Sequence, residues 1–269
     1  MQSTLTQLTN SKRVINAQQR LEIDQLNAYI TQEMIRLSTV SDLKTYNDGI
    51  KALRKYASDR FNEIIKGQID AIAEMLGNAF ALVFLGHLQL LASMRSMTVT
   101  LPPNFDIMKG YQGYILGRYY VPALSHAKRG FMKRFTRDAD GVRRAWLEGN
   151  VDVDTIYKWR DKAAGDTSRH FLFIDDQELH RVFEAAKYES AVYMYEVEGV
   201  ESYKYWQTKE DDRVRDTMKA NHVDMQGKTV RGHELFNLIP DGKAYAPANS
   251  GIAAQDINCR CHAIYFMKN

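Results

Sequence analysis

The sequence predicts a mostly α-helical α+β protein, with a long helical N-terminal region and a small α+β C-terminal module. Apolar residues recur every three to four positions through most of the first two-thirds of the chain, which is typical of amphipathic helices. The last third instead has short runs rich in Tyr, Trp, Thr and Val between glycine- and proline-containing turns. We expect a helical region over residues 1–101, a connecting region over 102–167 and the α+β module over 168–269.

Composition sets the broad class of the protein. The chain has 269 residues, of which 45% are hydrophobic and 26% charged, so it can bury a core. Its net charge of +3 does not by itself demand a nucleic-acid partner. The N-terminus has no apolar segment of the kind that marks a secretory signal, and the only two cysteines are one residue apart. We therefore expect a reducing compartment, and either a metal site or plain packing for the cysteines.

Two helices are predicted in the N-terminal region. The first covers residues 12–38, and the second covers residues 43–94 after a start at Asp42. Glycines at 67, 77 and 86 predict a break in the second helix. The two apolar stripes consist of Ile23, Leu26, Ile30, Met34 and Leu37, and of Phe61, Ile65, Ile69, Ile72, Leu76, Phe80 and Val83.

The segment 75–94 contains no charged residue and is about as long as a membrane-crossing helix. Asn78, His87, Gln89 and Ser93 interrupt it, and basic clusters do not flank it. We therefore expect a helix buried in a bundle or an oligomer, and we do not expect a membrane partner.

A basic stretch follows the break at Pro102-Pro103. It has eight basic and two acidic residues, so its net charge is +6. With Tyr119, Tyr120, Phe131 and Phe135 interleaved, it fits a DNA-facing surface or, as the favoured alternative, a solvated helix face whose aromatic rings point inward. The basic residues are Arg118, Lys128, Arg129, Lys133, Arg134, Arg137, Arg143 and Arg144.

The remaining elements are predicted from caps, periodicity and β propensity. Asp152 or Asp154 begins a helix that reaches residue 165, and Asp175-Asp176 begins another over 177–196. A strand over 201–208 and a helix over 213–221 follow. Further strands are expected at 228–230 and 259–266, and the segment 240–256 has no clear assignment.

The C-terminal third resembles the Mu-F-like minor head proteins of tailed bacteriophages, also called head morphogenesis proteins. The resemblance covers about residues 168–266 and depends on the order of its motifs. These are Gly199-Val200, Tyr205-Trp206, Asp212-Arg213 with Arg215, His222, Gly227, and Asn258-Cys259-Arg260-Cys261. The chain departs from the family pattern in a longer segment between Arg215 and His222, and in Asp175-Asp176-Gln177-Glu178 where the family has an Arg-Thr-Glu-like signature.

The resemblance implies a virion protein. Such proteins lie in few copies inside the head near the portal, after assembly in the host cytoplasm, and assist head assembly, DNA packaging or DNA ejection. The implied partners are the portal protein, the major capsid protein and the packaged double-stranded DNA, bound without sequence specificity. We expect residues 12–100 to contact the protein partners.

The two cysteines allow three interpretations. On one face of a strand, Cys259 and Cys261 could share a structural zinc ion with His222 and a fourth ligand such as Asp224 or His233. They could instead be small buried hydrophobic residues that pack on the helix 213–221, and we expect no cofactor on this favoured interpretation. As a third interpretation, a cysteine thiolate with His222 as base would make a nuclease, transferase or hydrolase. We expect a non-enzymatic protein, in which Asp212, Arg213 and Arg215 form a structural ion-pair knot and Arg260 pairs with Asp211, Asp212 or Asp256.

Overall fold

The computed structural model describes residues 2–102, 106 and 116–268. Helices dominate and the strands are confined to the C-terminal third, so the predicted fold class is confirmed. The helices are α1 (Gln2–Leu37), α2 (Leu43–Ser93), the π-helix η1 (Leu116–Tyr120), α4 (Val121–Leu147), α5 (Val153–Glu196) and α6 (Ala253–Asp256). The strands are β1 (Tyr203–Gln207), β2 (Asp216–Thr217), β3 (Ala220–Asn221), β4 (Thr229–Arg231), β5 (Phe236–Asn237), β6 (Lys243–Ala244) and β7 (His262–Phe266).

The chain forms two compact units that differ from the three consecutive segments expected from the sequence. The helical unit comprises residues 9–74 and 116–175, and the sheet-bearing unit comprises residues 1–8, 75–115 and 176–269. The helices α1, α2 and α5 therefore each contribute one part to each unit. The residues that resemble the phage motifs all lie in the sheet-bearing unit.

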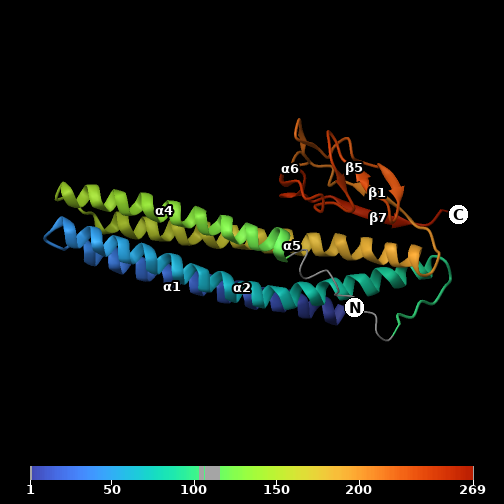
Figure 1. The fold of residues 1–269 in the computed structure, drawn as a ribbon, viewed down its shortest axis with the longest axis horizontal. Coiled ribbons are helices and arrows are strands. Elements are labelled where there is room, and N and C mark those ends of the chain that lie inside the picture. Colours follow the sequence, from blue (N-terminus) through green and yellow to red (C-terminus); the bar gives the residue numbers. More distant parts are fainter. Residues whose placement is uncertain (1, 103–105, 107–115, 269) are drawn as a thin grey trace. The chain divides into compact units, whose positions relative to one another are not determined.

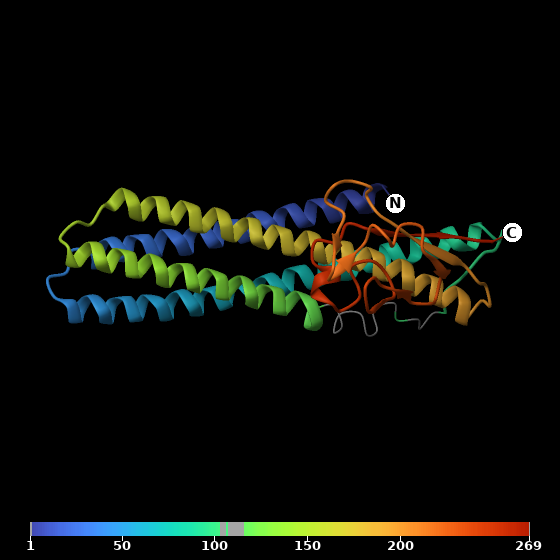
Figure 2. The same ribbon diagram turned by 90° about the horizontal axis from the view of Figure 1, so that it is seen from above.

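In the helical unit, segments of α1, α2, α4 and α5 lie side by side, and both interhelical turns lie at the same end (Figure 1, Figure 2). At that end the indole Nε1 of Trp146 donates a hydrogen bond to Val40 O at 3.1 Å. The predicted apolar stripe of α1 is buried. In the same unit the Phe61 ring of α2 meets the rings of Phe131 and Phe171 at 4.8 and 5.7 Å. The buried residues of this core include Ile23, Leu26, Ile30, Met34, Leu37, Phe61, Phe131, Phe135, Ile156 and Phe171.

The predicted break in the second helix is wrong, because α2 runs without interruption for 51 residues. Each helical glycine costs about 1 kcal/mol relative to alanine. Burial of one large apolar side chain is worth more, about 1.5–3 kcal/mol, and the stripe supplies several of them. The free energy gained by burying the apolar stripe therefore exceeds the cost of the glycines in the helix.

The charge-free end of α2 belongs to the sheet-bearing unit. Among the described residues, α2 is the one helix long and apolar enough to cross a membrane by length and composition, and half of its most apolar window is buried. His87 Nδ1 lies 2.6 Å from Ser190 Oγ of α5, and its ring meets the Tyr265 ring of β7 edge-on at 4.6 Å. His87, one of the four polar residues that interrupt this segment, thus has partners inside the sheet-bearing unit.

The two helices predicted over 150–165 and 177–196 are one helix, α5. Asp152 caps it, since its carboxylate accepts a hydrogen bond from Asp154 N at 3.0 Å. Asp175 does not begin a second helix. Its side chain is fully buried and accepts hydrogen bonds from Tyr120 Oη at 3.0 Å and Gln68 Nε2 at 3.2 Å. These tertiary partners satisfy the carboxylate that the sequence suggested as a cap.

The main sheet has the strand order β4-β1-β7, and all its pairs are antiparallel. Trp206 of β1 is paired with Ala263 of β7, so the strands predicted within 201–208 and 259–266 are hydrogen-bonded neighbours. The predicted strand at 228–230 corresponds to β4. Lys204 and Trp206, two residues apart, are both buried on one face of β1.

The predicted helix over 213–221 is wrong. The segment forms a small hairpin of β2 and β3, in which Asp216 pairs with Asn221 and Thr217 with Ala220. The Thr217 hydroxyl accepts from Ala220 N and donates to Ala220 O, both at 3.1 Å. Such local side-chain bonds give the backbone an alternative to helix formation. The segment 240–256, which had no clear assignment, contains β6 and α6.

A buried cysteine and histidine cluster in the sheet-bearing unit

His222, Cys259 and Cys261 converge in the interior of the sheet-bearing unit. Cys259 Sγ and Cys261 Sγ lie 3.8 and 3.6 Å from His222 Nδ1, and the three residues are only 2–4% exposed. Both cysteines precede β7 rather than lying within it. They nevertheless share the alternation of the buried strand residues Ala263 and Tyr265, so the expectation that they point to one side is met.

Gln255 of α6 fixes the orientation of the His222 ring. Its Nε2 donates hydrogen bonds to Ile239 O at 3.1 Å and Lys219 O at 3.4 Å, which leaves its Oε1 turned toward His222. That oxygen lies 2.9 Å from His222 Nε2 and can only accept, so Nε2 carries the proton. In the neutral ring, the Nδ1 lone pair then points at the two sulfur atoms.

Trp206 closes one side of the cluster. Its ring is 1% exposed and meets the rings of His222 and Phe236 edge-on at 5.4 and 5.3 Å. The two thiols differ in acidity. The hydrogen bond between them raises the pKa of Cys259 to about 11, together with burial, and lowers the pKa of Cys261. The Trp206 side chain also helps to lower the pKa of Cys261.

A second group, His180, Glu184 and His262, brings three further metal-type ligands within 4.8 Å of one another. Glu184 Oε2 accepts a hydrogen bond from Ala263 N at 2.8 Å, while Oε1 lies 3.1 Å from His262 Nδ1 and 2.6 Å from Lys187 Nζ. Burial alone would raise the pKa of Glu184, but the His262 hydrogen bond and the Lys187 charge lower it to about 2. This carboxylate therefore stays charged and ties α5 to β7.

The expected ion pair of Arg260 forms with Asp211. The guanidinium donates two hydrogen bonds to the carboxylate, at 2.8 and 2.6 Å, and this bidentate contact holds the pKa of Asp211 down at about 2. Asp212 and Arg213 are exposed. The ion pairs therefore form at Asp211, one residue before the predicted Asp212. Arg215 instead donates to Ala254 O, and its own carbonyl accepts from His222 N at 2.8 Å.

Backbone geometry explains several of the motif residues. Asn258, directly before Cys259, has a φ of +59°, a left-handed conformation that asparagine tolerates better than most residues. Gly227 has a φ of +74°, and its N–H donates to Trp206 O at 2.8 Å. Gly199, at +67°, ends α5, where Val200 N donates to Met194 O at 2.8 Å.

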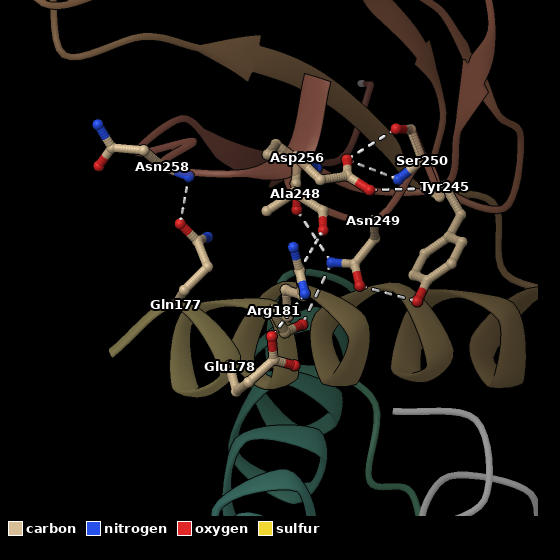
Figure 3. Close-up of polar contacts among 11 residues, drawn as sticks. Gln177, Glu178, Arg181, Tyr245, Ala248, Asn249, Ser250, Asp256 and Asn258 are labelled. Carbon is tan, nitrogen blue, oxygen red and sulfur yellow. Dashed lines mark hydrogen bonds and ion pairs between the residues drawn. The ribbon is translucent and has the colours of Figure 1, made fainter. Parts of the chain in front are cut away.

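Polar residues of α5 hold the loop that carries the cysteines (Figure 3). Arg181 is 5% exposed; its guanidinium lies 2.5 Å from Glu178 and donates to Ala248 O at 2.9 Å. Gln177 Oε1 accepts from Asn258 N at 2.6 Å. Further along the loop, Asn249 Nδ2 donates to Arg181 O and Pro247 O, and Asp256 accepts from Ser250 and Gly251.

Lys204 is buried in an aromatic cage, which no pattern in the sequence predicts. Its Nζ donates to Tyr245 O at 2.6 Å and lies 4.4 and 5.1 Å from the ring centres of Tyr188 and Phe236. Burial lowers the pKa of Lys204 to about 7. A strand residue with this charge would ordinarily be assigned to the solvent face.

The basic stretch of the helical unit is divided between two sides of α4. Lys128 donates to Asn62 Oδ1 at 2.7 Å, and Arg134 donates to Thr167 Oγ1 at 2.9 Å, so both face neighbouring helices. Phe131 and Phe135 are buried, as the inward-facing alternative predicts. The remaining stripe lines a groove with Arg54 of α2. Its α4 residues are Arg129, Met132, Lys133, Thr136, Arg137, Asp140 and Arg144.

As sequence reasoning expected, the structure brings His222, Cys259 and Cys261 together, and it groups neither Asp224 nor His233 with them. Asp224 accepts a hydrogen bond from Asn221 Nδ2 at 2.9 Å, and the His233 ring stacks on Tyr195 at 3.7 Å. A side-chain hydrogen bond with His180 helps to lower the pKa of Cys259. His180 lies on α5, about 80 residues earlier in the chain, and no spacing rule connects it to the cysteines.

A comparison of the chain with protein-family models, with curated proteins and with solved structures finds no match.

Proposed function

We propose that this chain is a minor head protein of a tailed bacteriophage, located inside the head near the portal, where it assists head assembly, DNA packaging or DNA ejection. The observation that carries the proposal is the mutual contact of the motif residues. Gly227 N donates a hydrogen bond to Trp206 O, and His222 N donates one to Arg215 O. Both cysteine sulfurs lie against the His222 ring. The ordered motifs that resemble the Mu-F-like family are thus parts of one core.

The burial of this core favours a structural role over the alternative of a cysteine-dependent enzyme. A nucleophilic thiolate needs an adjacent base and access to its substrate. His222 would supply the base, but both sulfurs belong to residues at most 4% exposed, and the raised pKa of Cys259 disfavours its thiolate. The geometry suits a rigid module better than a reacting centre.

Exposed apolar side chains on α1 are suited to contact the portal or major capsid protein. Val14 is 69% exposed and Leu21 is 51% exposed. The two residues are seven positions apart, so they lie on the same face of the helix. They lie within the region 12–100 that we expect to dock on protein partners. Exposed side chains of this kind can be replaced without disturbing the core, which makes them suitable for a docking test.

Purified particles of a phage that encodes this chain provide the test. The chain is expected in the particles in few copies, protected from added protease until the heads are opened. Val14→Glu with Leu21→Glu should reduce its incorporation while leaving its thermal unfolding unchanged. Leu147→Glu, at an equally exposed position of α4, is the matched control and should not reduce incorporation. Absence of the wild-type chain from the particles would refute the proposal.

We further propose that the α2–α4 groove of the helical unit faces the packaged DNA. Arg54, Arg129, Lys133, Arg137 and Arg144 line it, against the single acid Asp140. Cations on one helical face can neutralise successive phosphates without reading sequence. Each neutralised phosphate releases counterions, so binding should weaken with salt by a log–log slope of about −0.9 per contact.

Duplex binding by the purified protein over a salt series tests the groove. Changing Arg129, Lys133, Arg137 and Arg144 to Glu should remove binding and flatten the salt dependence. The control changes the same number of basic residues outside the groove, namely Arg13, Lys44, Lys66 and Lys158, and should keep most of the binding. Equal losses in the two variants would show that net charge alone, and not the groove, attracts DNA.

A further inference from the structure

We propose that Cys259, Cys261 and His222 bind one Zn²⁺ ion, with His180 as the fourth ligand. This inference is independent of the role in the phage head, because it rests on the geometry of the sheet-bearing unit alone. The three first-named ligand atoms already lie within 4.8 Å of one another. Zinc sites of the Cys₂His₂ type are tetrahedral, with Zn–S near 2.3 Å and Zn–N near 2.0–2.1 Å.

The distances match the edges of such a tetrahedron. With these bond lengths, a sulfur and a nitrogen bound to the same zinc ion lie about 3.6 Å apart. The observed separations from His222 Nδ1 are 3.6 Å to Cys261 Sγ and 3.8 Å to Cys259 Sγ. An ion can therefore enter between the three atoms with little movement of the backbone.

The hydrogen bond between His222 and Gln255 prepares the His222 ring for this role. A metal-binding histidine usually donates its other ring N–H to an oxygen atom, which fixes both the tautomer and the ring orientation. Here His222 Nε2 donates to Gln255 Oε1 at 2.9 Å, and two carbonyl groups hold the Gln255 amide in the required orientation. The unprotonated Nδ1 thus faces the sulfurs, as a ligand must.

His180 is suited to complete the coordination. Its Nε2 is buried and has no hydrogen-bond partner among the residues that the structure describes, so a metal ion would satisfy this atom. His180 also helps to lower the pKa of the Cys259 thiol. Two thiolates and two neutral imidazoles balance the charge of Zn²⁺, so the complete site can be buried without an uncompensated charge. The ion would connect three segments that are distant in sequence: α5, the segment before β4 and the segment before β7.

Metal content and cobalt spectroscopy of the full-length protein test the site. Purified under reducing conditions, the protein is expected to hold about one zinc ion per chain, as a single site of this type requires. Added to the metal-free protein, Co²⁺ should give intense visible bands of tetrahedral cobalt and near-ultraviolet thiolate-to-metal bands, and Zn²⁺ should abolish both. A wild-type protein that holds no zinc and gives no thiolate–cobalt bands would overturn the proposal.

Variants identify the ligands even if some of them destabilise the fold. Cys259→Ser and Cys261→Ser should each lose the tightly bound ion. Gln255→Leu keeps all four ligands and should weaken zinc binding by about 10–100-fold, as is typical when a metal-binding histidine loses the hydrogen bond of its other ring nitrogen. His233→Gln is the matched control, because His233 stacks on Tyr195, and it should bind zinc like the wild type.

The fourth ligand has its own test. His180→Gln should weaken zinc binding at least as much as Gln255→Leu while retaining the thiolate–cobalt bands, because both sulfurs remain. Wild-type affinity in His180→Gln would remove His180 from the site. Equal zinc content in the two cysteine variants and the wild type would show that the ion is bound elsewhere.

Discussion

The two compact units are stabilised in different ways. The helical unit buries periodic apolar stripes, and its surface ion pairs, such as Lys55–Asp59, join residues that are both more than half exposed. The sheet-bearing unit also has an apolar core, but many of its buried contacts are polar. They include Glu178–Arg181, Glu184 with three donors, and the caged Lys204. A periodic apolar core tolerates substitution, whereas a buried polar network depends on each partner.

The largest expected effect comes from Trp206. Trp206→Ala should destabilise the protein by about 3–5 kcal/mol, because it empties a site between His222 and Phe236. Phe61→Ala should cost a similar amount in the helical unit, where Phe61 is fully buried. Denaturant unfolding measures both losses, and limited proteolysis shows which segments open first. A Trp206→Ala protein of wild-type stability would contradict the buried position of the ring.

Breaking one ion pair in each unit should show most clearly that the two units are stabilised differently. Arg181→Ala removes the guanidinium that pairs with the buried Glu178 carboxylate, and breaking a buried ion pair typically costs about 3–5 kcal/mol. Lys55→Ala removes an exposed pair of the helical unit and should cost at most about 0.5 kcal/mol. Comparing the two free energies of unfolding tests the contrast. Near-equal losses would mean that the polar network of the sheet-bearing unit has no special importance.

The pH dependence of Lys204 provides a sharper test. Burial lowers its folded-state pKa from 10.5 to about 7, so the unfolded chain binds more protons between these values. Stability relative to Lys204→Met should therefore rise with pH by up to about 1.4 kcal/mol per unit from pH 7 to pH 9. Below pH 7 both states are protonated and the difference should become constant. A flat difference over pH 7–9 would show that the amine remains charged in the fold.

Glycine substitutions give the smallest effects and should differ in sign. Gly227 has a φ of +74°, so Gly227→Ala should destabilise the protein by about 1–2 kcal/mol. Gly130 lies in α4, and an added Cβ would meet no atom within 4 Å. Gly130→Ala should therefore stabilise the protein by about 0.5–1 kcal/mol. Thermal unfolding distinguishes the two, and the same sign for both would contradict the assigned backbone conformations.

The sequence by itself determined the elements whose signal is local. The stripe from Ile23 to Leu37 predicted α1, Asp42 and Asp152 marked helix starts, and the Tyr, Trp and Thr content of residues 201–208 predicted the central strand. In each case the residues that form the element lie within one or two turns, or within one strand, of each other. Periodicity and capping therefore contain the information needed.

Tertiary structure decided the rest, because the deciding partners are far apart in sequence. Gln68 and Tyr120 bind Asp175 and let α5 continue through a predicted start, while glycines failed to break α2 because distant side chains bury its stripe. At the site, the two cysteines and His222 were visible as ligand types. The sequence could not show that Gln255 orients the His222 ring, that His180 helps to lower the pKa of Cys259, or that an aromatic cage surrounds Lys204. Such contacts exist only once the chain has folded, since they join side chains separated by tens of residues.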